Sequence, residues 1–203
     1  MSSSPEIVVI VLRGSFSSCF SGGGFGSRQA ALRVFALGIW LFALTDFAQA
    51  ASGTIVALGT SNTRGRGVPL SESYPAQLEA TLRARGHKVR VVNMGVNGAS
   101  SAETLARVGS VPSGTALVLY EYARSNDQRK GVANSEVNMA AIQQQLAARG
   151  IKSIDVTGPI QAEFRQAFPR GMIVMDAGPH LNSQAYGEVV QSLVTQVESA
   201  LGR

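Results

Sequence analysis

From residue 51 to the C-terminus, short apolar runs alternate with segments that carry apolar residues at helical spacing. The runs have the length of single strands, and glycines close several of the helical segments. Because strands that alternate with helices form a parallel sheet covered on both faces, the sequence predicts an α/β protein, a three-layer α/β/α sandwich around a parallel five-stranded sheet. The expected strands are Ile55–Leu58, Val89–Asn93, Ala116–Tyr120, Ile151–Val156 and Met172–Met175, and the expected helices are Ser73–Arg85, Ala102–Val108, Ser135–Arg149 and Asn182–Leu201.

Composition is consistent with one folded domain. The chain has 203 residues, of which 45% are hydrophobic and 15% are charged, enough apolar material for a real core. Its formal net charge of +5 comes from lysines and arginines that are scattered along the chain. Because no long basic tract is interleaved with aromatic residues, nucleic-acid binding is not expected, and these charges are assigned to a solvated surface.

The first fifty residues have the parts of a secretory signal peptide. A basic flank, residues 28–33, precedes the apolar run Val34–Leu44, and Ala48-Gln49-Ala50 forms an A-x-A cleavage site. The apolar run is shorter than the about 20 residues that a bilayer span needs. The sequence therefore predicts a leader over residues 1–50, cleavage after Ala50 and a mature domain over residues 51–203. An uncleaved membrane anchor is the alternative.

This leader predicts that the protein is periplasmic or secreted, with no stable membrane insertion after signal cleavage. Cys19 is the only cysteine and would be removed with the leader. The mature chain would then have no disulfide, no thiolate metal site and no cysteine nucleophile.

The stretch Ile55–Thr63 joins an apolar strand, a glycine and small polar residues. Gly59 allows a sharp turn, so that Ser61 follows at the carboxyl end of the strand, where open α/β sheets bind their ligands. A serine at this place is held by rigid backbone and stays accessible to substrate, which makes Ser61 a candidate nucleophile. The alternative is that Thr60, Ser61 and Asn62 only form a polar turn and helix cap.

Two loops after later strands contain candidate hydrogen-bond donors. Residues 93–101 hold two glycines three positions apart before a predicted helix, so Gly98 can present its backbone N–H to the ligand crevice. The alternative is a tight strand-to-helix turn. The loop is not a dinucleotide fingerprint, because the G-x-G-x-x-G spacing is missing and no acidic residue ends the second strand. After the third strand, Asn126 can offer its side-chain amide to the same crevice or form an Asx turn.

The chain contains two histidines. His180 follows the fifth predicted strand, and Asp176 stands four residues before it in a Gly-Pro turn that can fold the carboxylate toward the ring. The two are a candidate base and its orienting acid. His87 lies at the start of the second strand, at the opposite end of the sheet, and is expected at the surface.

The order of these residues resembles the SGNH hydrolase (GDSL esterase/lipase) superfamily over residues 54–196. Residues 59–63, Gly-Thr-Ser-Asn-Thr, resemble the G-D-S-L-T block, and residues 93–98 resemble the N-x-G-x-x-G block, whose last glycine supplies an oxyanion amide. Asn126-Asp127 is similar to the end of the G-x-N-D block, and residues 176–180 are similar to the D-x-x-H block. Each block is weak alone, but four in this order at the expected strand ends are specific. The group most resembled is that of bacterial exported arylesterases, lysophospholipases and thioesterase I.

Three positions depart from the family's pattern. Thr60 replaces the aspartate of the first block, and Ser125 replaces the glycine before the family's asparagine, in a loop that is one residue longer. Asp176 stands four residues before His180 instead of three, so the triad acid can be shifted or replaced by a backbone carbonyl. The departures motivate an alternative of another class, an exported binding protein that keeps the scaffold and has little or no turnover.

The resemblance implies a flavodoxin-like fold and a serine hydrolase that cleaves carboxylic esters or thioesters through an acyl-enzyme intermediate. Ser61 is the implied nucleophile, His180 the base and Asp176 its orienter, and the amides of Ser61 and Gly98 and the side chain of Asn126 are the implied oxyanion donors. No metal or organic cofactor is implied.

The implied partners are small-molecule ester, thioester or acylated-sugar substrates, and the loop lengths do not identify the acyl or the alcohol group. A phosphate or nucleotide binder of the flavodoxin type is disfavoured, because the first loop lacks the successive backbone donors of a phosphate cradle.

Overall fold

The structure is a computed structural model that describes residues 52–202. The predicted leader, its cleavage site after Ala50 and Cys19 lie outside the described residues. Within residues 52–202, none of the helices combines the length and the apolar composition that crossing a bilayer requires.

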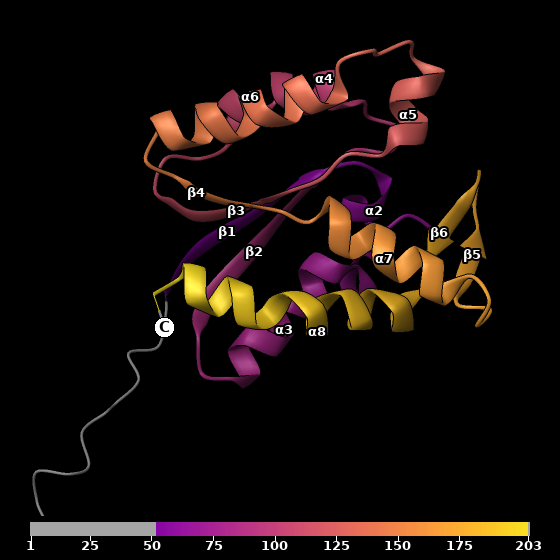
Figure 1. Cartoon of the computed structure of the whole chain (residues 1–203). Helices are drawn as coiled ribbons and strands as arrows, with labels where there is room; N and C mark the ends of the chain where they lie inside the picture. The colour runs from indigo at the N-terminus through magenta and orange to yellow at the C-terminus, as the bar shows by residue number, and fades with distance from the viewer. Residues whose placement is uncertain (1–51, 203) are drawn as a thin grey trace, which may run out of the picture. The chain divides into compact units, whose positions relative to one another are not determined.

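A four-stranded parallel sheet lies at the centre of the domain (Figure 1). Its strands are β1 (Ser52–Gly59), β2 (Lys88–Gly95), β3 (Thr115–Tyr120) and β4 (Lys152–Asp155), in the spatial order β2-β1-β3-β4. All three neighbouring pairs are parallel, so the carboxyl ends of β1, β2 and β3 meet at one edge of the sheet. The prediction of an α/β fold around a parallel sheet is confirmed.

Helices cover both faces of this sheet. In Figure 1, α4 (Ser101–Ala106) and α6 (Ser135–Ala148) lie over one face, and α3 (Tyr74–Ala84) and α8 (Ser183–Ala200) lie over the other. The remaining helical elements are α2 (Ser61–Arg64), α5 (Arg124–Arg129), α7 (Thr157–Ala167) and the 3₁₀ turns η1 (Leu70–Glu72) and η2 (Val108–Ser110).

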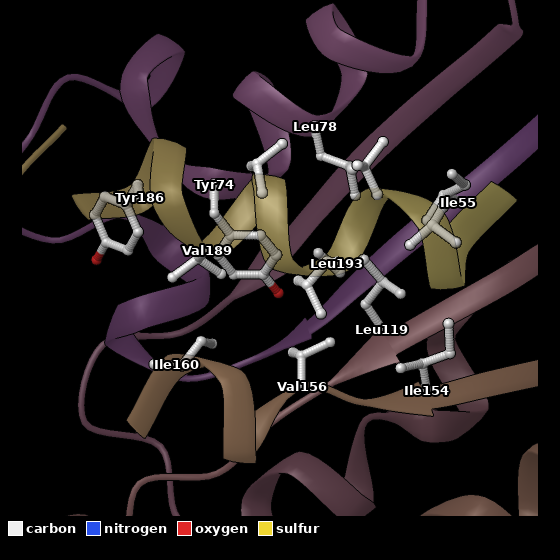
Figure 2. Packing of buried hydrophobic residues seen from close by; sticks show 14 of the residues in the cluster. Ile55, Tyr74, Leu78, Leu119, Ile154, Val156, Ile160, Tyr186, Val189 and Leu193 are labelled. Carbon is white, nitrogen blue, oxygen red and sulfur yellow. The ribbon is translucent and has the colours of Figure 1, made fainter. Parts of the chain in front are cut away.

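Alternate residues of β1 face two hydrophobic cores, because successive side chains of a strand point to opposite faces. Ile55 and Ala57 pack with residues of α3, α7 and α8, whereas Val56 and Leu58 pack with residues of η2 and α6. All four side chains are completely buried. Figure 2 shows the first of these cores, where Leu193 of α8 points toward the strands. The predicted three layers are therefore present, and β1 is buried between them.

The position of one strand differs from the prediction. The fifth expected strand forms β5 (Ile173–Met175), which pairs antiparallel with β6 (Pro179–Leu181) in a separate two-stranded sheet. Ala177 has a φ of 49° and Gly178 a φ of 120°, and these conformations close the tight hairpin. Val174 is paired with His180 across it. The histidine is therefore carried by a hairpin and not by a loop of the central sheet.

Besides the single turn α2, two helices lie where the sequence pattern predicts none. Helix α5 consists of polar and charged residues, so it has no apolar periodicity to detect. Helix α7 begins with Thr-Gly-Pro, which usually marks a turn, but burial of Ile160 and Ala167 in the first core stabilises it. Both helices line the candidate site described next.

Candidate active site

Ser61 is the first residue of α2 and stands two positions after the last residue of β1. The turn between them requires glycine at position 59, because a Cβ there would lie 2.3 Å from the Thr63 hydroxyl and 2.7 Å from Glu121 Oε1. Helix α2 is a single turn that ends at Gly65, which has a left-handed φ of 79°. Ser61 is 8% exposed, so a short, tightly packed turn presents its side chain to solvent only narrowly.

The buried carboxyl group of Glu121 holds this turn in place. Its Oε1 atom accepts hydrogen bonds from the backbone N–H of Thr60 (2.6 Å) and of Thr63 (3.3 Å), and from both threonine hydroxyls (2.9 Å each). Burial raises the pKa of Glu121 above its ordinary value, although the hydrogen bonds from the threonines oppose this shift. The position that departs from the family's aspartate, Thr60, thus contacts a carboxyl group that follows β3.

Gly98 lies in the turn between β2 and α4 and has a φ of 74°. A Cβ at this position would meet nothing within 4 Å, so the backbone conformation, and not lack of space, favours glycine here. The backbone N–H groups of Gly98 and Ser61 have no acceptor among residues 52–202. Both are therefore available to a ligand, as donors to an oxyanion must be.

Asn126 lies on α5 and is 4% exposed. Its amide nitrogen donates a hydrogen bond of 2.9 Å to the carbonyl of Ala99, and its carbonyl oxygen accepts one from the guanidinium of Arg129. Because an amide nitrogen carries two N–H bonds, one of them remains for a ligand. The neighbours of Asn126 thus fix its orientation without using both of its donors.

The ring of His180 is held by backbone. Its Nδ1 atom lies 3.1 Å from the carbonyl oxygen of Gly178, which can only accept, so Nδ1 carries the proton and Nε2 is the acceptor in the neutral ring. Burial lowers the pKa of His180, and the charge of Arg66 lowers it further. Three contacts raise this pKa instead: the hydrogen bond to the Gly178 carbonyl, the charge of the Asp176 carboxylate and the backbone carbonyl of Asp176.

The side chain of Asp176 is directed to Arg66. Its carboxylate accepts hydrogen bonds from Nε (3.3 Å) and Nη2 (3.4 Å) of that arginine, and about half of the side chain is exposed. The residue that the sequence proposes as orienter of the His180 ring therefore forms an ion pair with an arginine, while a backbone carbonyl contacts the ring nitrogen.

One pocket of about 400 Å³ brings four of the five predicted site residues together: Ser61, Gly98, Asn126 and His180 line it, whereas Asp176 does not. Within the described part of the chain, no hydrogen bond joins the Ser61 hydroxyl to the His180 ring. Residues of α5, α7 and β6 complete the lining.

Sequence reasoning missed two features of this site and placed one histidine wrongly. The first missed feature is Glu121, which the sequence does mark, because it is a carboxylate directly after a predicted buried strand. The second is the set of arginines that line the pocket, and no local sequence pattern points to them. His87 is not a surface residue: it is 2% exposed, and its Nε2 lies 3.0 Å from Glu198 Oε1, because α8 covers this end of the sheet.

Among residues 52–202, no group of three or more His, Cys, Asp or Glu side chains is arranged to hold a metal ion.

Comparison with known proteins shows the fold. No family model matches the chain. The esterase TesA of Pseudomonas aeruginosa is 33% identical over 108 residues, which cover 51% of this chain and 53% of TesA. The chain thus aligns with about half the length of this curated relative.

Two solved structures match over almost their whole length. The psychrotrophic esterase EstA of a Pseudoalteromonas species has a TM-score of 0.58 at 16% identity, covering 75% of this chain and 100% of EstA. A lipolytic protein of the G-D-S-L family from Desulfitobacterium hafniense has a TM-score of 0.55 at 17% identity, covering 71% of this chain and 99% of that protein.

Proposed function

We propose that the chain is a member of the SGNH hydrolase (GDSL) superfamily and a serine hydrolase that cleaves carboxylic esters or thioesters through an acyl-enzyme intermediate. The observation that supports this most directly is the convergence of Ser61, Gly98, Asn126 and His180 on one pocket. These residues come from three strand ends and a hairpin that are far apart in the chain.

In the first step, the Ser61 hydroxyl attacks the ester carbonyl while Nε2 of His180 takes its proton. The Nδ1 proton donated to Gly178 leaves Nε2 as the acceptor, which is the tautomer that a general base needs. Hydrogen bonds between nucleophile and base are often long or absent without substrate and form in the substrate complex. The imidazolium of His180 then gives its proton to the leaving alcohol or thiol, whose bond to the carbonyl carbon breaks as the acyl-enzyme forms. Water next attacks the acyl-enzyme with the neutral His180 again as base. The proton then returns to the Ser61 oxygen as the carboxylic acid leaves.

The negative charge that develops on the carbonyl oxygen is stabilised by three donors. We assign this role to the backbone N–H groups of Ser61 and Gly98 and to the second side-chain N–H of Asn126. Each such preorganised donor contributes on the order of 10²–10³ in turnover. Since nearby residues already fix the backbone and the amide, little reorganisation is needed when the charge appears.

We assign Asp176 a supporting role in this mechanism. Its negative charge and its backbone carbonyl raise the pKa of His180 and so favour the imidazolium that forms during the reaction. The Gly178 carbonyl orients the ring. No metal or organic cofactor takes part in the proposed chemistry.

We further propose that the enzyme is exported, with its mature form starting at Ala51, because residues 1–50 have the parts of a signal peptide. N-terminal sequencing of the protein recovered from the periplasm and the medium tests the cleavage site. A form that retains the leader and sediments with membranes would support an anchor.

Labelling with a fluorophosphonate tests the proposed nucleophile. EstA, which shares this fold, has a structure inhibited by monoethylphosphonate, so a phosphorus electrophile is a suitable probe. We expect one label per molecule on Ser61 and none in Ser61→Ala, which should retain its fold and lose hydrolysis of p-nitrophenyl butyrate. Ser125→Ala is the matched control, because Ser125 lines the same pocket, and it should still be labelled.

An unlabelled wild-type protein without esterase activity would support a binding protein instead. A panel of acetyl, butyryl and longer acyl esters, thioesters and acetylated sugars, assayed with wild type and Ser61→Ala, then identifies the preferred substrate.

A further inference from the structure

The pocket that contains Ser61 has a basic wall. Arg66, Arg124 and Arg129 line it, and its lining includes neither aspartate nor glutamate. Arg66 forms an ion pair with Asp176, so its charge is largely compensated. Two cationic side chains on α5 remain.

No carboxylate compensates these two charges. Arg129 donates to the neutral amide of Asn126, and Arg124 is exposed and has no acidic partner among residues 52–202. Asp127, the only acidic residue of α5, is 1% exposed, and its Oδ1 accepts the backbone N–H of Ser101 at 2.7 Å, toward α4. The arginine charges therefore act on whatever occupies the pocket.

Other residues of the same lining are apolar. Ile160 and Phe164, both on α7, line the pocket, and so does Pro179 of β6. A neutral, fully apolar ester would leave the two guanidinium groups without an anionic partner. A ligand with an apolar part and an anionic part would match both kinds of wall.

We propose that the substrate is an ester that carries a carboxylate or phosphate group in addition to an apolar chain. Arg124 and Arg129 bind the anionic group, and the side chains of α7 bind the apolar chain. The inference rests on the proposed esterase function and names the substrate class of the same site. Guanidinium groups suit this role, because their planar donors match the oxygens of carboxylate and phosphate.

Matched ester pairs that differ in charge test this inference. The first pair is 4-(butyryloxy)benzoate and its methyl ester; the second is 1-decanoylglycerol 3-phosphate and 1-decanoylglycerol, which tests whether the anion belongs to a lipid. Each kcat/KM is divided by the rate of hydroxide hydrolysis to remove intrinsic reactivity. We expect the anionic member of at least one pair to be preferred roughly 3- to 10-fold at low salt. The preference should fall toward unity in 0.5 M NaCl, because salt screens exposed charges.

Arginine variants give the second measurement. The ratio of anionic to neutral kcat/KM should fall in Arg124→Gln and approach unity in the Arg124→Gln, Arg129→Gln double variant. Arg165→Gln is the control, because Arg165 is exposed on α7 outside the pocket lining, and the wild-type ratio should be retained. A ratio of unity or less in both pairs with wild type, or a ratio that the double variant does not change, overturns the inference.

A binding measurement separates failure of this inference from failure of the proposed function. In Ser61→Ala, NMR titration with 4-hydroxybenzoate and with its methyl ester needs no turnover. Tighter binding of the carboxylate, lost on adding Arg124→Gln and Arg129→Gln, supports the basic wall even if no ester is hydrolysed. Equal or weaker binding of the carboxylate counts against it, even if esterase activity and labelling of Ser61 are found.

Discussion

The hydroxyl of Thr60 donates a hydrogen bond of 2.9 Å to Oε1 of Glu121, a residue 61 positions later in the chain. Glu121 directly follows β3, the strand paired with β1, so parallel pairing brings its carboxyl group under the turn that carries Ser61. The SGNH block that Thr60 resembles has an aspartate at this position. In this chain, the carboxyl group at the turn therefore comes from the neighbouring strand.

Glu121→Ala should strongly destabilise the protein. The substitution removes the acceptor of four hydrogen bonds. It leaves the N–H groups of Thr60 and Thr63 and the Thr60 hydroxyl buried without a partner, while the Thr63 hydroxyl keeps only its 3.4 Å contact with the Tyr74 hydroxyl. We expect a loss of roughly 2–4 kcal/mol in the free energy of unfolding, measured in urea. Glu72→Ala, at an exposed position, is the control and should change it by at most about 0.5 kcal/mol. Equal stability of the two variants would show that the carboxyl group does not hold the turn.

Gly98→Ala should lower kcat because it changes the backbone conformation at position 98, and not because the added methyl group clashes. The substitution creates no clash, but a φ of 74° costs a residue with a Cβ about 1–2 kcal/mol, so the oxyanion N–H should shift. Gly114→Ala is the matched control, because Gly114 has a φ of 78° and equally free space before β3, outside the pocket. Both variants should lose similar stability, and only Gly98→Ala should lose turnover. If the two variants retain the same activity, Gly98 is not an oxyanion donor.

Asn126→Ala should reduce kcat by roughly one to three orders of magnitude, with little change in KM, because the proposed donor acts on charge that develops in the transition state. Asn138→Ala is the control: it removes an amide that donates to the Ser101 hydroxyl at 2.9 Å outside the pocket. The kcat of Asn138→Ala should remain within about twofold of that of wild type. A wild-type kcat in Asn126→Ala would exclude the amide from the oxyanion site.

Asp176→Asn should have a small effect on kcat/KM, at most about fivefold. The carboxylate is half exposed and paired with Arg66, and exposed ion pairs contribute about 0–1 kcal/mol. Loss of an acid that orients the catalytic histidine costs about 10⁴ in turnover. Steady-state kinetics with p-nitrophenyl butyrate separates these outcomes, with the melting temperature as the folding control. A loss of three orders of magnitude or more would mean that Asp176 turns toward the ring during catalysis.

The acid limb of the pH profile of kcat/KM should lie below pH 6.5. The general base must be neutral, and burial together with the charge of Arg66 lowers the pKa of His180, so the neutral ring persists to lower pH than for a free histidine. Arg66→Gln should move the limb to higher pH, because it removes the cation that disfavours the imidazolium. A limb above pH 6.5 in wild type, or a shift to lower pH in the variant, would contradict this electrostatic assignment.

Local patterns were sufficient to predict the layered architecture, but not that the fifth predicted strand pairs in a separate hairpin instead of the central sheet. The alternation of strand and helix periods predicts the parallel sheet, and the small residues after Gly59 mark the strand end at Ser61. Because parallel strands share one carboxyl edge, the order of Ser61, Gly98 and Asn126 along the chain already indicated that these residues meet. Helix α7 escaped prediction because its first residues favour a turn, and only its packing against the core makes it a helix.

What the sequence by itself determined was the layering of the fold and the set of side chains at one edge of the sheet, since both follow from the periods and turn preferences of short segments. Only the tertiary structure decided which polar groups pair: Glu121 with Thr60, Asp176 with Arg66, Gly178 with His180 and Glu198 with His87. Three of these pairs join residues more than sixty positions apart, and the fourth depends on a hairpin closed by two left-handed residues. Hydrogen bonds act within about 3.5 Å, so packing, not sequence spacing, selects their partners.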